Sequence, residues 1–175
     1  LIGQKKLQDA EKPLRKTIEL KPDFFQAHLN LGAALKSMGQ LKEAEKACRK
    51  AIDLNPNLFD SHFLLSSILI GQKKLQDAEE PLRKTIALKP DLAAAHFNLG
   101  NVLNDLGKLQ ESERSLRKAI ELKPDFAVAH SNLGNIQGDL GNLQDAEILY
   151  RNAIELDPKF AEAHSNLGNI LGDLG

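Results

Sequence analysis

Five histidines recur every 34 residues along this chain, and histidine is a common ligand of metal ions. They are His28, His62, His96, His130 and His164. A zinc site needs several ligands that converge on one ion, at about 2.0–2.1 Å from each nitrogen. Histidines separated by a whole repeating unit cannot converge in this way. We therefore expect half-buried packing histidines and no metal site.

Carboxamide side chains form two further rows at the same interval. The first row is Asn30, Asn98, Asn132 and Asn166, interrupted by Leu64; the second is Asn101, Asn135 and Asn169. Each amide carries donors and acceptors together, so a row of them could hold an extended peptide backbone without reading its side chains. Aspartates follow the second row, at Asp105, Asp139 and Asp173, and would favour basic ligands. The alternative is that these are ordinary solvated polar positions.

Cys48 is the only cysteine, so an intrachain disulfide is excluded and a reducing compartment is compatible. It occupies a position that Leu82, Leu116 and Tyr150 fill elsewhere, which predicts a small core residue rather than a nucleophile. The pattern contains neither a glycine-rich phosphate loop after a strand nor paired carboxylates in a closed pocket. We expect no enzymatic activity, no cofactor and a cytoplasmic location.

Two helical patterns alternate within each period. Ala93–Leu106 carries His96, Leu99 and Leu103 at the spacing of an amphipathic helix, and Gly107 ends it. A second apolar stripe runs from Leu109 to Leu122, and a proline closes the unit. The asparagines and aspartates lie on the side of the first helix opposite its apolar stripe. Gln137 replaces a leucine of that stripe and predicts a local weakness.

The composition limits the classes of partner. The chain has 175 residues, of which 42% are hydrophobic and 27% charged, and its formal net charge is −1. This charge gives no electrostatic reason for binding nucleic acid or an anionic membrane. No apolar run approaches the roughly 20 residues that a membrane-spanning helix requires.

The repeating unit resembles the tetratricopeptide repeat, whose signature is 34 residues long. The first-helix motif is His28-x2-Leu31-Gly32-x2-Leu35 and its copies, and the second-helix motif is Ala44-x3-Cys48-x2-Ala51 with Pro56. The resemblance covers the whole chain, although no tryptophan occupies the first site of the motif. It implies a right-handed α-solenoid of antiparallel helical hairpins. The predicted organisation is one array, with partial repeats at 1–24 and 161–175 and full repeats at 25–58, 59–92, 93–126 and 127–160.

Tetratricopeptide arrays line their concave surface with the first helix of each hairpin, so the resemblance implies that the asparagine rows face inward. These rows are similar to the asparagine ladder in the superhelical repeats of the O-linked N-acetylglucosamine transferase. Family members that capture acidic C-termini place lysine and arginine on this surface, whereas here only Lys36 comes near it. That mode of binding is not expected.

A possible apolar patch distinguishes the unit at 59–92. Phe63, Leu64 and Ile70 lie off its apolar stripe, beside Leu29 and Phe97 of the adjoining units. Such a patch could receive a partner side chain or helix, or it could seal the packing between helices.

Three functions follow as hypotheses. The first is a non-catalytic scaffold that binds an extended peptide or partner segment in the concave groove. The second is the substrate-recognition arm of a larger enzyme, such as a glycosyltransferase. The third is self-association, in which the open ends stack head to tail. The sequence names neither the ligand nor the pathway.

Overall fold

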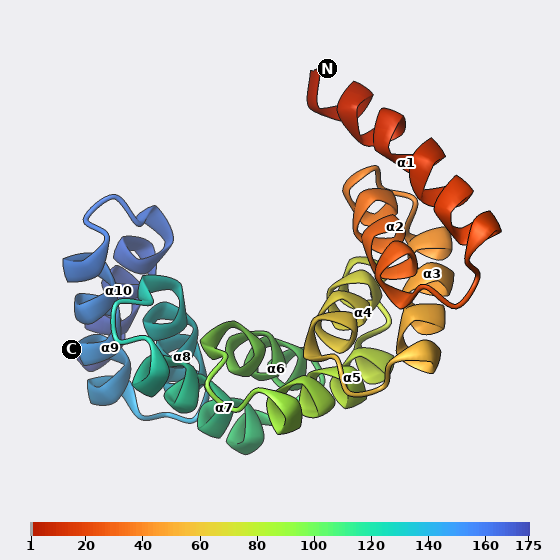
Figure 1. Ribbon diagram of the computed structural model, residues 1–175. Helices are drawn as coiled ribbons and strands as arrows, with labels where there is room; N and C mark the ends of the chain where they lie inside the picture. Colours follow the sequence, from red (N-terminus) through yellow and green to blue (C-terminus); the bar gives the residue numbers. More distant parts are fainter. Residues whose placement is uncertain (1) are drawn as a thin grey trace. The chain divides into compact units, whose positions relative to one another are not determined.

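The computed structural model describes the backbone of residues 2–175 and the side chains of residues 9–175 (Figure 1). The described residues form ten helices and no strands, and they divide into two compact units, Leu1–Pro90 and Asp91–Gly175. Unit 1 contains α1 (Ile2–Leu20), α2 (Phe25–Ser37), α3 (Leu41–Leu54), α4 (Phe59–Gly71) and α5 (Leu75–Leu88). Unit 2 contains α6 (Ala93–Asp105), α7 (Leu109–Leu122), α8 (Ala127–Asp139), α9 (Leu143–Leu156) and α10 (Ala161–Leu174).

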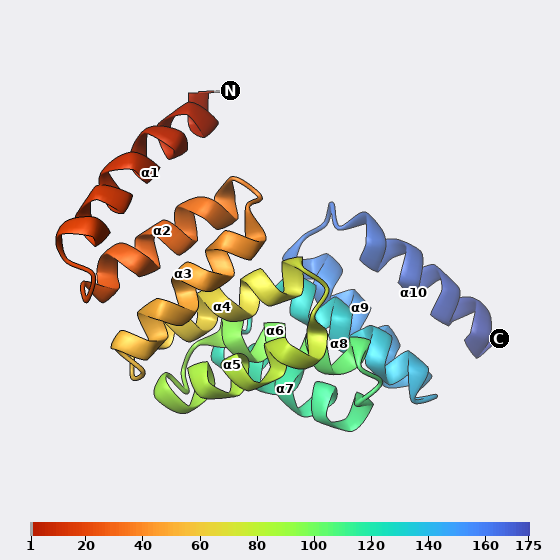
Figure 2. The same ribbon diagram turned by 90° about the vertical axis from the view of Figure 1, so that its right-hand side faces the viewer.

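Within each unit, consecutive helices pack as antiparallel hairpins. The pairs are α2 with α3 and α4 with α5 in unit 1, and α6 with α7 and α8 with α9 in unit 2. The opposite course of α2 and α3 can be followed in Figure 2. The predicted all-α fold of repeated helical hairpins is therefore confirmed. The division into repeats at the stated boundaries stays a prediction.

A residue with a left-handed backbone ends the turn inside each hairpin. Gly39, Gly107 and Gly141 have φ values of +77°, +74° and +80°. Glycine adopts this conformation without the clash that a Cβ atom causes. In the α4–α5 turn the corresponding residue is Lys73, with a φ of +60°. The turn geometry is thus kept at Lys73 at a cost in backbone energy.

Glycine inside a first helix has a different role, since it lets the second helix of the hairpin come close. A Cβ atom added to Gly100 would lie 2.7 Å from Cγ of Leu116, and one added to Gly134 would lie 2.8 Å from Cε1 of Tyr150. Both distances are too short for real Cβ contacts. The two helices of the hairpin are therefore closely packed at these two positions. At Gly168 no atom lies within 4 Å of the added Cβ.

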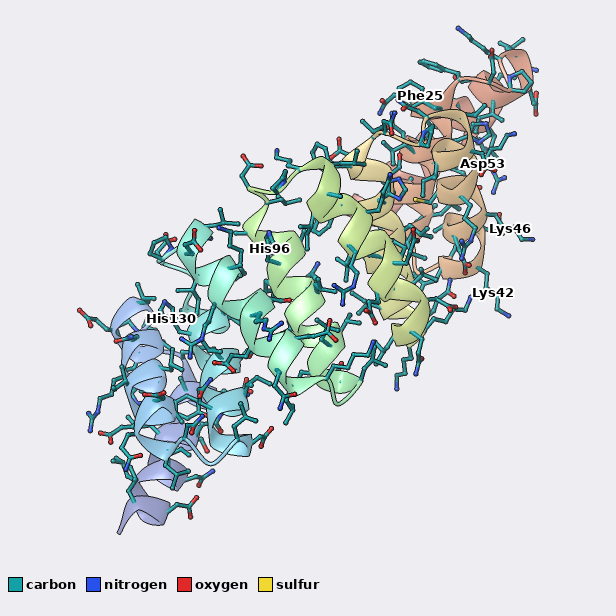
Figure 3. All side chains as sticks on the ribbon, turned by 90° about the horizontal axis from the view of Figure 1, so that it is seen from below. Phe25, Lys42, Lys46, Asp53, His96 and His130 are labelled. Carbon is teal, nitrogen blue, oxygen red and sulfur yellow. The ribbon has the colours of Figure 1, made fainter. Side chains whose placement is uncertain are left out.

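The histidines tie the proline turn to the following helix. Nε2 of the ring donates to the carbonyl oxygen of the proline six residues earlier, at 2.8 Å for His28, 2.9 Å for His62, 2.9 Å for His130 and 3.1 Å for His164. His28, His62 and His130 are buried, His96 is half-buried and His164 is exposed. Figure 3 labels His96 and His130 on the first helices of consecutive hairpins in unit 2. The rings of His28, His62 and His130 thus belong to the packing and are more buried than the sequence predicts, whereas the ring of His164 is exposed.

Each second helix carries an ion pair on its solvated side, between a glutamate and an arginine one helical turn later. The pairs are Glu11–Arg15, Glu45–Arg49, Glu79–Arg83, Glu113–Arg117 and Glu147–Arg151. Glutamate before arginine at this spacing stabilises a helix by about 0.2–0.5 kcal/mol.

Candidate functional site

The predicted asparagines all lie on the first helices of the hairpins, α2, α6, α8 and α10. Asn98, Asn101, Asn132, Asn135 and Asn166 are half-buried, whereas Asn30 and Asn169 are exposed. The aspartates Asp105, Asp139 and Asp173 are exposed, and none of them forms an ion pair among residues 9–175.

In unit 2 the two asparagine rows are joined by hydrogen bonds. Nδ2 of Asn132 on α8 donates to Oδ1 of Asn101 on α6, at 2.8 Å. One hairpin further on, Nδ2 of Asn166 on α10 donates to Oδ1 of Asn135 on α8, at 2.9 Å. Each bond connects the first row in one hairpin to the second row in the hairpin before it. The spacing of the two rows in the sequence does not reveal this pairing.

Tyr150 adds a third group to the second pair. Its hydroxyl donates to Oδ1 of Asn135 at 2.7 Å, and its ring is almost fully buried against Gly134. Oδ1 of Asn135 therefore accepts two hydrogen bonds, one for each lone pair. The side-chain orientation of Asn135 is thereby fixed, with its Nδ2 group left as the donor. Leu116 occupies the equivalent position beside Asn101 and supplies no such bond.

A cleft accompanies each amide pair. The first cleft has a volume of about 140 Å³ and includes Asn101, Asn104, Asp105, Asn132 and Asn135 in its lining. The second has a volume of about 320 Å³. Its lining comprises Asn135, Gly138, Asp139, Leu143, Tyr150, Asn166, Asn169, Ile170 and Asp173. Eight of the predicted site residues thus meet in two neighbouring clefts of unit 2.

The electrostatic environment of the second cleft is negative. Burial raises the pKa of the Tyr150 hydroxyl, and the nearby carboxylates of Asp139 and Glu162 raise it further. The hydroxyl therefore stays protonated and keeps its role as a donor to Asn135 at neutral pH.

Asn30, the first-row asparagine of unit 1, does not take part in an amide pair of this kind with any described residue. Oδ1 of Asn30 accepts a hydrogen bond from Nε2 of Gln26 at 3.1 Å. Asn30 also lines a mainly apolar cleft of about 560 Å³ between α1 and α2, together with Ala33 and Ser37. No second-row asparagine is present there, because Ala33 stands where Asn101 and Asn135 stand in unit 2.

The residues of the predicted apolar patch are largely engaged in packing. Leu29 is buried, and Phe63, Leu64 and Ile70 are half-buried. A Cδ atom of Leu64 lies over Gly32, 3.5 Å from where a Cβ atom would be. Phe97 packs against Phe126 within unit 2, with ring centroids 4.6 Å apart. These contacts favour the alternative in which the side chains seal helix packing.

Cys48 is fully buried and its thiol donates to the backbone oxygen of Ser61 at 3.0 Å. Burial raises the pKa of this thiol to about 12, so it is not a nucleophile at neutral pH. Among the residues whose side chains are described, no group of three or more histidine, cysteine, aspartate or glutamate residues could hold a metal ion. No helix in the described part of the chain has the length and apolarity needed to span a membrane.

Comparison with protein families identifies the repeating unit. A model of the tetratricopeptide repeat matches residues 25–58, and a second model, described as a TPR repeat, matches residues 100–141 and 139–175. No curated protein sequence matches the chain.

Solved structures share the fold. The crystal structure of YrrB, described as a TPR protein with an unusual peptide-binding site, has a TM-score of 0.84 at 23% identity. That match covers 94% of this chain and 85% of YrrB. MamA from Desulfovibrio magneticus RS-1 has a TM-score of 0.83 at 21% identity, covering 88% and 87%. TTC0263, a thermophilic TPR protein of Thermus thermophilus, has a TM-score of 0.68 at 21% identity, covering 98% and 93%. At these identities the likeness concerns the fold alone.

Proposed function

Because this chain contains tetratricopeptide repeats, we propose that it is a non-catalytic protein-interaction module that binds an extended peptide along α6, α8 and α10. The observation that carries the proposal is the pairing of the asparagine rows in unit 2. Protein or peptide is the class of partner that such a surface suits.

The pairing leaves a regular set of polar atoms without a partner among residues 9–175. Asn132 and Asn166 use Nδ2 in the pairs, so their Oδ1 atoms remain as acceptors. Asn101 and Asn135 use Oδ1, so their Nδ2 groups remain as donors. A peptide backbone carries one N–H donor and one C=O acceptor per residue and complements this alternation. The half-buried amides are already held in place, which lowers the entropy lost on binding.

The peptide-binding proposal concerns every asparagine and aspartate of the predicted rows, but the support is concentrated in unit 2. Asn30 lacks a second-row partner, and no hydrogen bond to Asn98 is present in the described structure. The hypotheses of a recognition arm and of a head-to-tail array stay predictions, because no observation on the described residues tests them.

A peptide-array experiment tests the proposal. The test variant is Asn98→Ala/Asn132→Ala/Asn166→Ala, which removes the first row in unit 2. We expect its affinity for the peptides that the native protein selects to fall about tenfold or more, since each lost hydrogen bond contributes about 1 kcal/mol. The affinity is then measured in solution by fluorescence anisotropy.

A matched control removes three amides at the same interval from the second helices. Gln76, Gln110 and Gln144 are exposed and lie on α5, α7 and α9. Their replacement by alanine should leave peptide affinity unchanged, and circular dichroism should show both variants folded. Equal affinities for the native protein and the Asn98→Ala/Asn132→Ala/Asn166→Ala variant would exclude the amide rows as the binding site.

A further inference from the structure

The two clefts of unit 2 are the same site, repeated one hairpin apart. Asn101, Asp105 and Asn132 of the first cleft correspond to Asn135, Asp139 and Asn166 of the second. Two equivalent positions differ: Asn104 is replaced by Gly138, and Leu116 is replaced by Tyr150. The second cleft, with about 320 Å³ against about 140 Å³, is the wider one.

Gly138 contributes part of the additional space. It lies at the penultimate position of α8, and it contributes no side chain where Asn104 contributes a carboxamide. A Cβ atom built on Gly138 would meet only Cδ1 of Ile170, at 3.5 Å, which is an ordinary van der Waals distance. The backbone of Gly138 has no positive φ that would require glycine. A larger residue would therefore be tolerated there and would narrow the cleft.

The lining of the wider cleft is amphipathic. Leu143, Gly138 and Ile170 give it an apolar part, and the exposed carboxylates of Asp139 and Asp173 lie at its polar part. None of its lining residues is a lysine or an arginine. A lysine or arginine side chain has a matching distribution, because its methylene stem packs on apolar surface while its charged end stays near carboxylates and water.

Tyr150 determines whether Asn135 offers a hydrogen-bond donor or an acceptor to the backbone of a ligand beside this cleft. Because Oδ1 of Asn135 already accepts bonds from Tyr150 and Asn166, only the Nδ2 group can engage a ligand. This group donates, so it selects a carbonyl oxygen. At the first cleft, Oδ1 of Asn101 accepts one bond from Asn132 and retains a lone pair, so the selection is weaker.

We propose that the cleft between α8, α9 and α10 is the anchor pocket for the bound segment and takes one lysine or arginine side chain. The backbone carbonyl beside that residue accepts a hydrogen bond from Nδ2 of Asn135, and Asp139 and Asp173 face the cationic end of the side chain. This inference rests on the proposed function. It adds which side chain the bound peptide carries and which of the two clefts beside the amide rows binds that side chain.

The test uses libraries of acetylated and amidated nine-residue peptides, in which the central residue is fixed as lysine, arginine, norleucine or glutamate. Norleucine keeps the apolar stem of lysine and lacks its charge. The native protein should retain the lysine and arginine libraries about fivefold better than the norleucine library, a ratio in the range of exposed ion pairs. Gly138→Asn places the carboxamide of the narrower cleft at this position, with Tyr150 unchanged, and should abolish this preference while the total retention of peptide persists.

A matched control is Asn104→Gly, which opens the first cleft and should leave the preference for lysine and arginine in place. Thermal melting should show Gly138→Asn at least as stable as the native protein, because asparagine is a slightly better helix former than glycine. Retention of no library by the native protein would overturn the proposed function itself. Retention without a cationic preference, or a preference that survives Gly138→Asn, would overturn the anchor pocket and leave the peptide-binding role standing.

Discussion

Single ionised side chains connect hairpins in unit 1, and Glu45 is the clearest example. Its carboxylate accepts from Nζ of Lys74 at 2.9 Å and pairs with Arg49 at 3.0 Å. The hydrogen bond from Lys74, and after it the one from Arg49, hold the pKa of Glu45 at about 2, below its ordinary value of 4.5. Because Lys74 precedes α5 and Glu45 lies on α3, this interaction links two successive hairpins.

The lowered pKa predicts how stability depends on pH. The interaction stabilises the fold fully above the unfolded-state pKa of 4.5, and this contribution is lost as the pH falls through about 2. Glu45→Gln should lower the free energy of unfolding by about 0.5–1 kcal/mol at pH 7. Urea denaturation between pH 7 and pH 2.5 should show the difference shrinking below pH 4.5.

A control for Glu45→Gln is Glu80→Gln, which removes the same charge from an exposed residue without an ion pair among residues 9–175. Its stability should follow the native protein at every pH. A difference for Glu45→Gln that stays constant down to pH 2.5 would contradict the assigned role.

At the scale of the elements, the α4–α5 turn is the one that departs from its siblings. Lys73 has a φ of +60° where three other turns have glycine. Lys73→Gly removes the backbone strain but adds freedom to the unfolded chain, so the net gain should be about 0.5–1 kcal/mol. Chemical denaturation measures it.

The same change inside a helix should act in the opposite direction. Lys50 is an exposed residue in the interior of α3, and Lys50→Gly should lower the stability by about 1 kcal/mol. If Lys73→Gly also destabilised the protein, the side chain of Lys73 rather than its backbone would determine the energy of the turn.

The hairpins were predictable from the sequence because periodicity reports directly on which helix face is buried. Glycine after a first helix and leucine in its apolar stripe are local signals: Gly107 has a left-handed backbone in the turn, and Leu103 is buried. The pairing of Asn132 with Asn101 was not predictable in this way. It depends on the offset between neighbouring hairpins, which places one residue beside another 31 positions away. The same holds for Tyr150, whose seam position predicts burial but not the direction of its hydroxyl.

At the scale of the whole molecule, each compact unit contains a buried polar residue at a position where the equivalent residues of the other hairpins are apolar. Ser61 in unit 1 is fully buried, and its hydroxyl has no hydrogen-bond partner among residues 9–175, whereas the equivalent residues are alanines. In unit 2, Gln137 is almost fully buried, and its Nε2 has no hydrogen-bond partner among the described side chains, although Oε1 accepts from Nδ2 of Asn142 at 2.8 Å. This supports the weakness that the sequence predicts at Gln137, where the siblings are leucines.

Replacing both buried polar side chains should raise the free energy of unfolding by the sum of the two single effects. Ser61→Ala and Gln137→Leu should each raise the free energy of unfolding by about 1 kcal/mol, because a buried unsatisfied group costs about 1–3 kcal/mol. Asn142 is exposed and can bind water in place of Gln137. Since the two sites share no partner, the double variant should equal the sum within about 0.5 kcal/mol. Denaturant titration of the three variants checks this, and a double variant no more stable than either single one would refute it.

The hydrogen bonds between the asparagines all run the same way, from a later hairpin to the one before it. The surface they form consequently has a direction. From Asn101 to Asn166, the free groups begin with a donor and end with an acceptor. On the proposed function, a reversed polypeptide could restore the same matches only by shifting along the surface, so the direction and the register of a bound segment would be coupled.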